Sequence, residues 1–154
     1  MNKISSYFAP TGFQRLIAFT GVVLLLSLAR VSTADQENFG DYELHYIAFN
    51  SQFLQPDVAK SYGIERSPRV GLVNISVLEN GKPVKADVEI ESANLLSQKT
   101  MLKPWLVDEG IAMYYLATFE HTNGELLHFT VRVTPENSQI SKSVRFSKKF
   151  YEKL

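Results

Sequence analysis

The sequence predicts an all-β protein, an antiparallel immunoglobulin-like β-sandwich of about seven strands with one short helix, preceded by a signal peptide. Three observations support this prediction. An apolar N-terminal run ends in small residues, apolar and polar side chains alternate through much of the remaining chain, and Asn-Gly pairs separate alternating segments. The chain therefore divides into a signal peptide, residues 1–34, and a single sandwich domain, residues 35–154.

The N-terminal segment predicts export. The apolar run Leu16–Ala29 would reach ~21 Å as a helix, whereas the apolar core of a bilayer is about 30 Å thick. Lys3 and Arg15 precede this run, and Val31-Ser32-Thr33-Ala34 has the small residues of a cleavage site. We expect a cut after Ala34, a periplasmic location, and no integral membrane span after processing. An uncleaved signal anchor and a buried core helix are the alternatives.

The composition of the mature chain excludes several classes of function. Removing Lys3, Arg15 and Arg30 from the 16 basic side chains leaves 13 against 16 acidic ones, a net charge of −3. This balance provides no basic field for nucleic acid. The absence of cysteine excludes disulfides, thiolate chemistry and Cys-based zinc sites. A small exported domain without disulfides must rely on packing, which fits the 45% hydrophobic content of the chain and a bacterial periplasm.

Alternation places the first three strands. Residues 42–53 are rich in aromatic side chains, and residues 73–77 and 84–92 carry apolar groups at every second position. Asn80-Gly81, between the last two, is typical of a two-residue hairpin turn. This turn predicts three pairs across the hairpin, namely Val77 with Val84, Ile75 with Ala86 and Val73 with Val88.

The segment QPDVAKSYG between the first two strands predicts the one helix. Pro56 suits the first helical position, and Gly63 suits the left-handed conformation that ends a helix. Val58, Ala59 and Tyr62 would then share a face that caps one end of the sandwich.

The next segment, IERSPR, must run extended because Ser67 precedes a proline. Such a segment mostly serves to connect two strands. The alternative is a recognition loop that presents Arg66 and Arg69 near the helix end, as contacts for a ligand or partner.

Four further strands complete the domain, at residues 95–106, 111–122, 125–135 and 140–151. Asn123-Gly124 predicts a second two-residue hairpin turn. In that hairpin His121 would pair with Leu126, and Phe119 would pair with His128.

Two stretches carry a resemblance to a known family. FLQPDVAKSYGIERSPRVGLVNISVLENGKPVKADVEI and, further on, EGIAMYYLATFEHTNGELLHFTVRVTP are similar to exported proteins of Gram-negative bacteria grouped as domain of unknown function 4426. The resemblance extends from about Gly40 to Phe150. It implies export and a β-sandwich, and it supplies no activity, cofactor or catalytic residue.

The histidines are the candidate metal ligands. In the predicted second hairpin, His121 and His128 would lie diagonally on one face at about 7 to 8 Å, within reach of one metal ion. His45 would join them only if the first strand neighboured that hairpin. Two surface histidines are the simpler interpretation, and a periplasmic copper or zinc protein is the alternative.

Trp105 is the candidate contact residue. Aromatic side chains are more numerous than one core needs, and a surplus on an outer face would mark a protein or ligand contact. Trp105 follows Pro104, which suits an edge strand, so the indole would be placed to bind a partner. Packing in the core or at its rim is the alternative.

No motif predicts an enzyme. Asp87, Glu89 and Glu91 form a carboxylate row, but the opposite face of their strand is apolar, which leaves the row in water. The sequence has no Gly-x-Ser-x-Gly elbow, no glycine-rich phosphate loop and no His-Glu-x-x-His helix.

The last strand is basic, since it carries Lys142, Arg145, Lys148, Lys149 and Lys153. Lysines on a terminal strand protect a sheet edge against pairing with another chain. A patch for anionic lipid or polysaccharide is the alternative.

Together these features predict a soluble periplasmic binding or assembly module that is not an enzyme and has no cofactor. Its expected partner is an envelope protein or ligand of unknown identity. Two other functions remain open: a metal-binding protein that uses His121 and His128, and an envelope-associated domain that uses the basic C-terminal strand.

Overall fold

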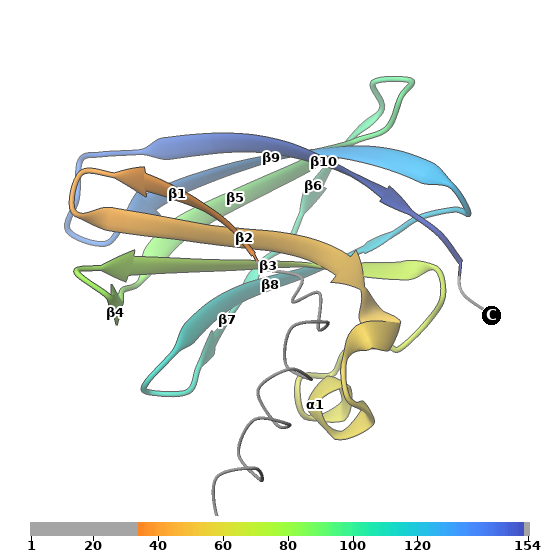
Figure 1. Ribbon diagram of the computed structural model, residues 1–154, viewed down its shortest axis with the longest axis horizontal. Coiled ribbons are helices and arrows are strands. Elements are labelled where there is room, and N and C mark those ends of the chain that lie inside the picture. The colour runs from red at the N-terminus through yellow and green to blue at the C-terminus, as the bar shows by residue number, and fades with distance from the viewer. Residues whose placement is uncertain (1–33, 153–154) are drawn as a thin grey trace, which may run out of the picture. The chain divides into compact units, whose positions relative to one another are not determined.

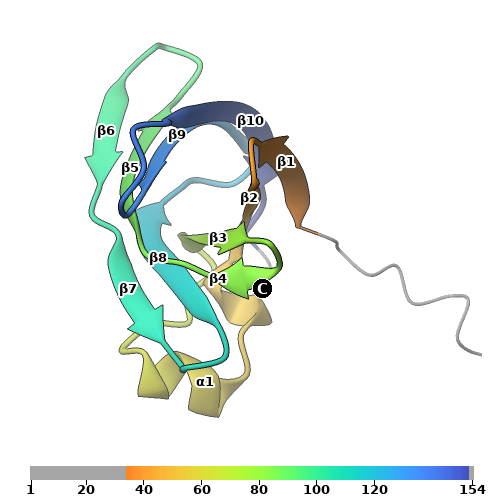
Figure 2. The same cartoon turned by 90° about the vertical axis from the view of Figure 1, so that its left-hand side faces the viewer.

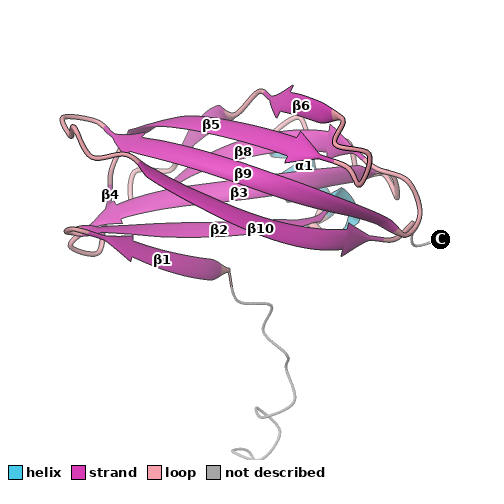
Figure 3. Cartoon of the chain, turned by 90° about the horizontal axis from the view of Figure 1, so that it is seen from above, coloured by secondary structure: helices cyan, strands magenta, loops and turns pink. Residues whose placement is uncertain are grey.

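The computed structural model describes residues 34–152. Within them, ten strands form two antiparallel sheets that face each other across a shared core (Figures 1 and 3). The predicted signal peptide lies outside the described residues except for Ala34. The predicted all-β sandwich is confirmed. In chain order the elements are β1 (Asp35–Phe39), β2 (Tyr42–Asn50), the 3-10 helix η2 (Ser51–Phe53), α1 (Pro56–Ser61), β3 (Val70–Glu79), β4 (Lys82–Pro83), β5 (Ala86–Ala93), β6 (Lys99–Leu102), β7 (Trp105–Asp108), β8 (Met113–Glu120), β9 (Glu125–Pro135) and β10 (Lys142–Phe150).

The strand order is that of an immunoglobulin-like sandwich. The first sheet has the order β1-β2-β3-β8-β7, with β4 added to β3, and the second has the order β10-β9-β5-β6. Strands β2, β3, β8 and β7 thus correspond to strands A, B, E and D of an immunoglobulin domain, and β5, β9 and β10 correspond to C, F and G. The predicted topology class is therefore confirmed, with β1 and β6 as additional strands.

The described part of the chain has ten strands where the sequence predicts about seven. The predicted strand at residues 95–106 is divided into β6 and β7, because the chain passes from the second sheet to the first at Pro104, which has no N–H for a ladder. The other two additions are β1, whose polar sequence DQENF shows no apolar alternation, and the two-residue β4.

The turn at Asn80-Gly81 is as predicted, but the pairing beyond it is not. The two residues have φ values of 50° and 76°, and the N–H of Val84 donates to Val77 O at 3.0 Å. The chain then crosses to the second sheet, where β5 pairs with β9. Alternating apolar and polar side chains suit a strand in either sheet, so this pattern did not show which sheet β5 joins. Two predicted pairs are therefore wrong, Ile75 with Ala86 and Val73 with Val88.

The hairpin predicted at Asn123-Gly124 is wrong. β8 pairs with β3 and β7 in the first sheet, whereas β9 pairs with β5 and β10 in the second. The turn therefore joins the two sheets. Gly124 has a φ of 75°, and the Glu125 carboxylate accepts the N–H of Thr122 at 2.7 Å. Neither predicted pair across this turn forms, because Phe119 lies opposite Gly71, and His128 lies opposite Ala93 and Ser147.

The core lies between the two sheets, and phenylalanine rings form its centre. The rings of Phe119, Phe129 and Phe150 meet edge to face, with centroids 5.0 to 6.2 Å apart. Such contacts add to the stabilisation that apolar burial provides. Aliphatic side chains with no exposed surface surround these rings, including Leu44, Ile75, Ile90 and Val131. Packing of this kind holds together a sandwich that has no disulfide.

α1 lies over the outer side of the first sheet. Pro56 occupies its first position, and Gly63 follows its end with a φ of 67°, both as predicted. Val58, expected on the buried face, is 38% exposed, so that part of the prediction is wrong. Beneath the helix is a second apolar cluster, which we call the outer cluster; its buried members are Ala59, Ile64, Leu72 and Leu116.

Candidate functional site

A groove lies on the side of the sandwich where β6 and β7 end their sheets. Figure 2 shows these two strands on one side of the molecule. The groove has a volume of about 1020 Å³, at the upper end of the range for ligand pockets. It is lined by the segment after α1, the start of β3, the ends of β5 and β8, and β6 with its crossing to β7. Its lining residues include Tyr62, Glu65, Met101, Lys103, Trp105 and Glu120.

Trp105 connects the groove to the outer cluster. It begins β7 and lies opposite Leu116 of β8. Its side chain is half-buried, packs against the outer cluster, and also lines the groove. The structure thus places the indole at the rim of apolar packing, with part of its surface open to a ligand.

Two other side chains shape the groove. Met101 on β6 is 60% exposed. Tyr62, after α1, donates its O–H to the Glu109 carboxylate in the turn between β7 and β8. This hydrogen bond raises the pKa of Tyr62 above its usual value of 10.0. Burial and the charge of Glu109 raise it further by smaller amounts. One wall of the groove is therefore tied to a turn that lies far from it in sequence.

The charged side chains of the groove are mostly acidic. Glu65 and Glu120 line it together with Lys103. None of these three forms an ion pair within residues 34–152. The groove therefore favours a ligand that combines apolar groups with basic ones.

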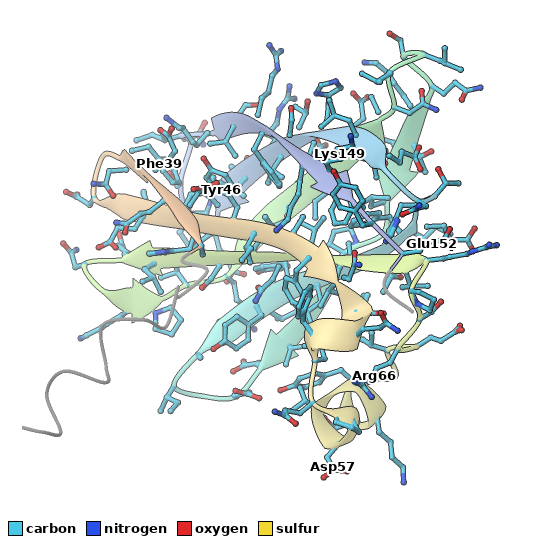
Figure 4. The ribbon with its side chains drawn as sticks, turned by 45° about the vertical axis from the view of Figure 1, so that its right-hand side comes forward. Phe39, Tyr46, Asp57, Arg66, Lys149 and Glu152 are labelled. Carbon is cyan, nitrogen blue, oxygen red and sulfur yellow. The ribbon has the colours of Figure 1, made fainter. Side chains whose placement is uncertain are left out.

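The two arginines predicted as contact residues lie outside the lining of the groove. Arg66 Nη2 donates to Gln52 O at 3.0 Å, and Figure 4 shows this side chain beside α1. Arg69 Nε lies 3.2 Å from Glu152 Oε1, near the C-terminal end of the described chain. Both side chains fasten the α1–β3 connection to neighbouring segments.

The structure does not bring His121 and His128 together. His121 is 3% exposed, and its ring contacts those of Phe119 and Phe150 in the core. His128 is exposed on β9, where its Nδ1 lies 2.6 Å from Ser147 Oγ. Residues 34–152 contain no group of three or more His, Cys, Asp or Glu side chains arranged for a metal ion.

One nitrogen of His121 is unsatisfied. Nδ1 lies 3.2 Å from Thr122 O, which fits a ring that carries its proton there and donates it. Nε2 is buried and has no hydrogen-bond partner among the described residues. A buried polar atom without a partner costs about 1–3 kcal/mol.

The basic side chains of β10 do not form one patch. Lys148 shares the inward face of the strand with Val144 and Phe150, and burial is the main cause that lowers its pKa below 10.5. Lys142 Nζ lies 3.1 Å from Glu37 Oε2 of β1. Lys149, which is labelled in Figure 4, lies over the ring of Tyr151, with 5.5 Å from Nζ to the ring centroid. An inward lysine on an edge strand fits the protective role predicted for this strand.

Sequence analysis did not single out Met101 or Glu120, which the fold brings beside Trp105. The available signal was Pro104, because a proline between two apolar segments marks a break in a strand. The sequence contains no local sign that the two halves of the broken strand end different sheets.

These features define the class of the protein, an immunoglobulin-like β-sandwich with a groove along one pair of sheet edges. The chain belongs to the family described as Domain of unknown function (DUF4426), which its residues 36–153 match. The crystal structure of a DUF4426 family protein from Pseudomonas aeruginosa PAO1 is 34% identical, with a TM-score of 0.72, and the match covers 80% of this chain and 99% of that chain. The crystallised relative is thus almost entirely sandwich domain.

The fold also resembles that of FetP from uropathogenic Escherichia coli strain F11, at 10% identity. A structure of FetP as isolated, after recombinant expression in the periplasm, has a TM-score of 0.51 and covers 77% of this chain and 94% of that chain. A copper-bound FetP variant has a TM-score of 0.50, with 77% and 95% covered. At this identity the likeness concerns the fold alone. No curated protein matches the chain, and residues 34–152 include no helix long and apolar enough to cross a membrane.

Proposed function

We propose that this protein is an exported periplasmic binding module without enzymatic activity, and that its groove holds an extended polypeptide segment of an envelope protein. The observation that carries the proposal is the groove beside β6 and β7, with the half-buried Trp105 in its wall. Large aromatic side chains at such positions often supply much of the binding energy of an interface.

A polypeptide segment fits because two sheet edges border the groove. β6 ends the second sheet and β7 ends the first, so each has one side without a neighbouring strand among the described residues. The free N–H and C=O groups of such an edge can pair with an added strand. β7 has the sequence WLVD, which includes no lysine to protect it.

The side chains of the groove would provide specificity. Trp105 and Met101 offer apolar surface that adapts to a partner without leaving a charge unpaired. The carboxylates of Glu65 and Glu120, against the single ammonium of Lys103, favour a segment with basic side chains. The expected ligand is an extended segment that carries both apolar and basic residues.

The periplasmic part of the proposal rests on residues 1–34. Their short apolar run and small-residue cleavage pattern support removal of this segment on export. Mass spectrometry of the protein from a periplasmic fraction should therefore find Asp35 as the first residue. An intact chain from Met1, recovered with membranes, would contradict this part.

The non-enzymatic part rests on the absence of catalytic motifs from the sequence.

A selection from a displayed library of short random peptides tests the binding function. The wild-type protein should enrich peptides with apolar and basic residues, and these should not bind a Trp105→Ala protein. Leu106→Ser provides the control, because Leu106 is an exposed apolar residue of the same strand but does not line the groove. No enrichment, or equal binding to the Trp105→Ala protein, would contradict the proposal.

Metal binding is the second candidate function. The fold likeness to copper-bound FetP favours it, as does the unsatisfied Nε2 of His121, because a free imidazole nitrogen is a metal ligand. The separate positions of His121 and His128 oppose a site that uses both. Calorimetric titration with copper and with zinc distinguishes the candidates, since tight binding that His121→Ala and His128→Ala both abolish would favour the metal function.

A further inference from the structure

The hairpin between β5 and β6 ends in an exposed apolar tip. Residues 94–98 form this tip, which we call the leucine tip, and it projects beyond the strands in Figures 1 and 2. Leu95 and Leu96 within it are 70% and 79% exposed. Single exposed apolar residues are common on protein surfaces, whereas two adjacent leucines at a projecting end make a continuous apolar surface.

Four backbone N–H groups of the leucine tip form hydrogen bonds within the tip, at residues 94, 96, 97 and 98. Asn94 Oδ1 accepts the N–H of Leu96 and the N–H of Gln98, each at 3.0 Å. The Asn94 carbonyl accepts the N–H of Ser97 at 2.9 Å, and the Asn94 N–H donates to Gln98 O at 3.2 Å. The groups in these four bonds have no need of water, so these bonds would be retained in an apolar medium. Its conformation is also fixed before binding, which lowers the ordering cost.

Cationic side chains lie behind the tip on the outer side of the second sheet. The strand register aligns Ser147, His128, Ala93 and Lys99 in one row across that sheet. Lys149 lies one step nearer the end of β10 on the same side. Lys99 Nζ is 3.0 Å from Glu91 Oε1. Glu91 lies farther from the tip than Lys99, because it is two residues before Ala93, the register partner of Lys99.

We propose that the leucine tip docks on an anionic lipid bilayer. Leu95 and Leu96 enter the boundary between headgroups and acyl chains, and Lys99 and Lys149 lie at the level of the phosphates. Lipid is the occupant that the observations favour over a protein pocket, because the tip projects from the sandwich, four of its N–H groups are already paired, and Lys99 and Lys149 lie behind it. The proposal does not depend on the groove.

Cosedimentation with vesicles of phosphatidylethanolamine and phosphatidylglycerol tests this proposal. The protein used is the chain from Asp35, which contains the whole sandwich and corresponds to the region that folds in the crystallised relative. A Leu95→Ser/Leu96→Ser protein should lose about tenfold or more in vesicle partition. The matched control is Ile111→Ser/Ile140→Ser, which removes two exposed aliphatic side chains from loops at the other end of β8 and β9.

A second readout locates the contact. Because the chain has no cysteine, Ser97→Cys provides a unique site for a polarity-sensitive fluorophore, and Ile140→Cys provides the control site. Vesicles should shift the emission of the label at residue 97 toward that of an apolar medium and leave the label at residue 140 unchanged. Failure of the wild-type chain to sediment, equal sedimentation of the serine variant, or equal shifts at both labels would overturn the proposal.

Discussion

The ring of Phe119 lies directly against the backbone of Gly71, its register partner on β3. A Cβ added at Gly71 would lie 2.1 Å from the nearest atom of that ring. Phe119 in turn meets Phe129 and Phe150 edge to face. Gly71 therefore makes room for the aromatic centre of the core, and this role is one of space rather than of a special backbone angle.

Gly71→Ala should destabilise the domain by about 1–3 kcal/mol, the usual cost of overpacking a core. Urea unfolding measures this change. In a Phe119→Leu background the smaller side chain leaves room for the added methyl group, so the penalty of Gly71→Ala should shrink. Equal penalties in the two backgrounds would contradict the packing explanation.

Substitution of Gly81 or Gly124 should also destabilise the domain, but through backbone strain rather than through lack of space. Both have positive φ, 76° and 75°, with no heavy atom nearer than 3.9 Å to an added Cβ. Gly81→Ala and Gly124→Ala should each cost about 1–2 kcal/mol through backbone strain alone. Thermal melts check this prediction, and a melting temperature equal to that of the wild type would contradict the turn assignment.

Lys148 should reduce stability while it is charged. Burial lowers its pKa below 10.5 in the folded state, so the unfolded chain binds more protons just below that pH. The stability linked to this group is therefore fully present only above pH 10.5, and it is lost as the pH falls through the folded pKa. Lys148→Met should raise the free energy of unfolding at neutral pH. Lys149→Met, at an exposed position of the same strand, is the control, and a fall in stability with Lys148→Met would contradict the prediction.

Ionisation of Tyr62 should lower the stability of the fold at alkaline pH. The hydrogen bond to Glu109 raises the pKa of Tyr62 above 10.0. Its contribution to stability is therefore fully present below pH 10.0 and is lost as the pH rises through the folded pKa. Melting temperatures of the wild type should fall more steeply above that pH than those of a Tyr62→Phe protein. Parallel curves for the two proteins would show that the bond contributes nothing.

The sequence predicted correctly those features that depend on a few adjacent residues. The first position of α1 at Pro56, the left-handed Gly63, and the tight turn at Asn80-Gly81 are properties of a few adjacent residues, and the structure has all of them. The inward and outward faces of the strands also follow from a period of two. The sandwich class could therefore be predicted from sequence.

Pairing between strands could not be predicted in the same way. Asn123-Gly124 has the composition of a hairpin turn, yet it joins β8 to β9 across the two sheets. A two-residue turn and a crossing between sheets leave the same local pattern, because alternating side chains suit either partner. The wrong prediction that His121 and His128 lie diagonally on one face followed directly from this ambiguity.

The groove was beyond sequence analysis for the same reason. Trp105 was a candidate because of its size and its neighbour Pro104, but Met101 and Glu120 reach it only through the arrangement of β6, β7 and β8. Arg66 and Arg69 were candidates because they follow a helix end. The structure instead gives each of them a partner that holds the α1–β3 connection in place.

Stability and binding at Trp105 must be separated, because its ring also packs on the outer cluster. Ile64→Ala provides the matched control, since Ile64 is buried in that cluster and does not line the groove. Its loss should lower stability by about 2–5 kcal/mol. At a temperature where all variants are folded, Ile64→Ala should leave affinity for a selected peptide unchanged, whereas Trp105→Ala should abolish it.

The most direct test of the binding function observes the indole itself. The chain contains one tryptophan, so its side-chain N–H gives a single NMR resonance that reports on the groove. Titration with a peptide selected by the wild-type protein should shift this resonance and saturate at the stoichiometry that calorimetry measures. A peptide that binds by calorimetry and leaves the indole resonance of Trp105 unmoved would contradict the account.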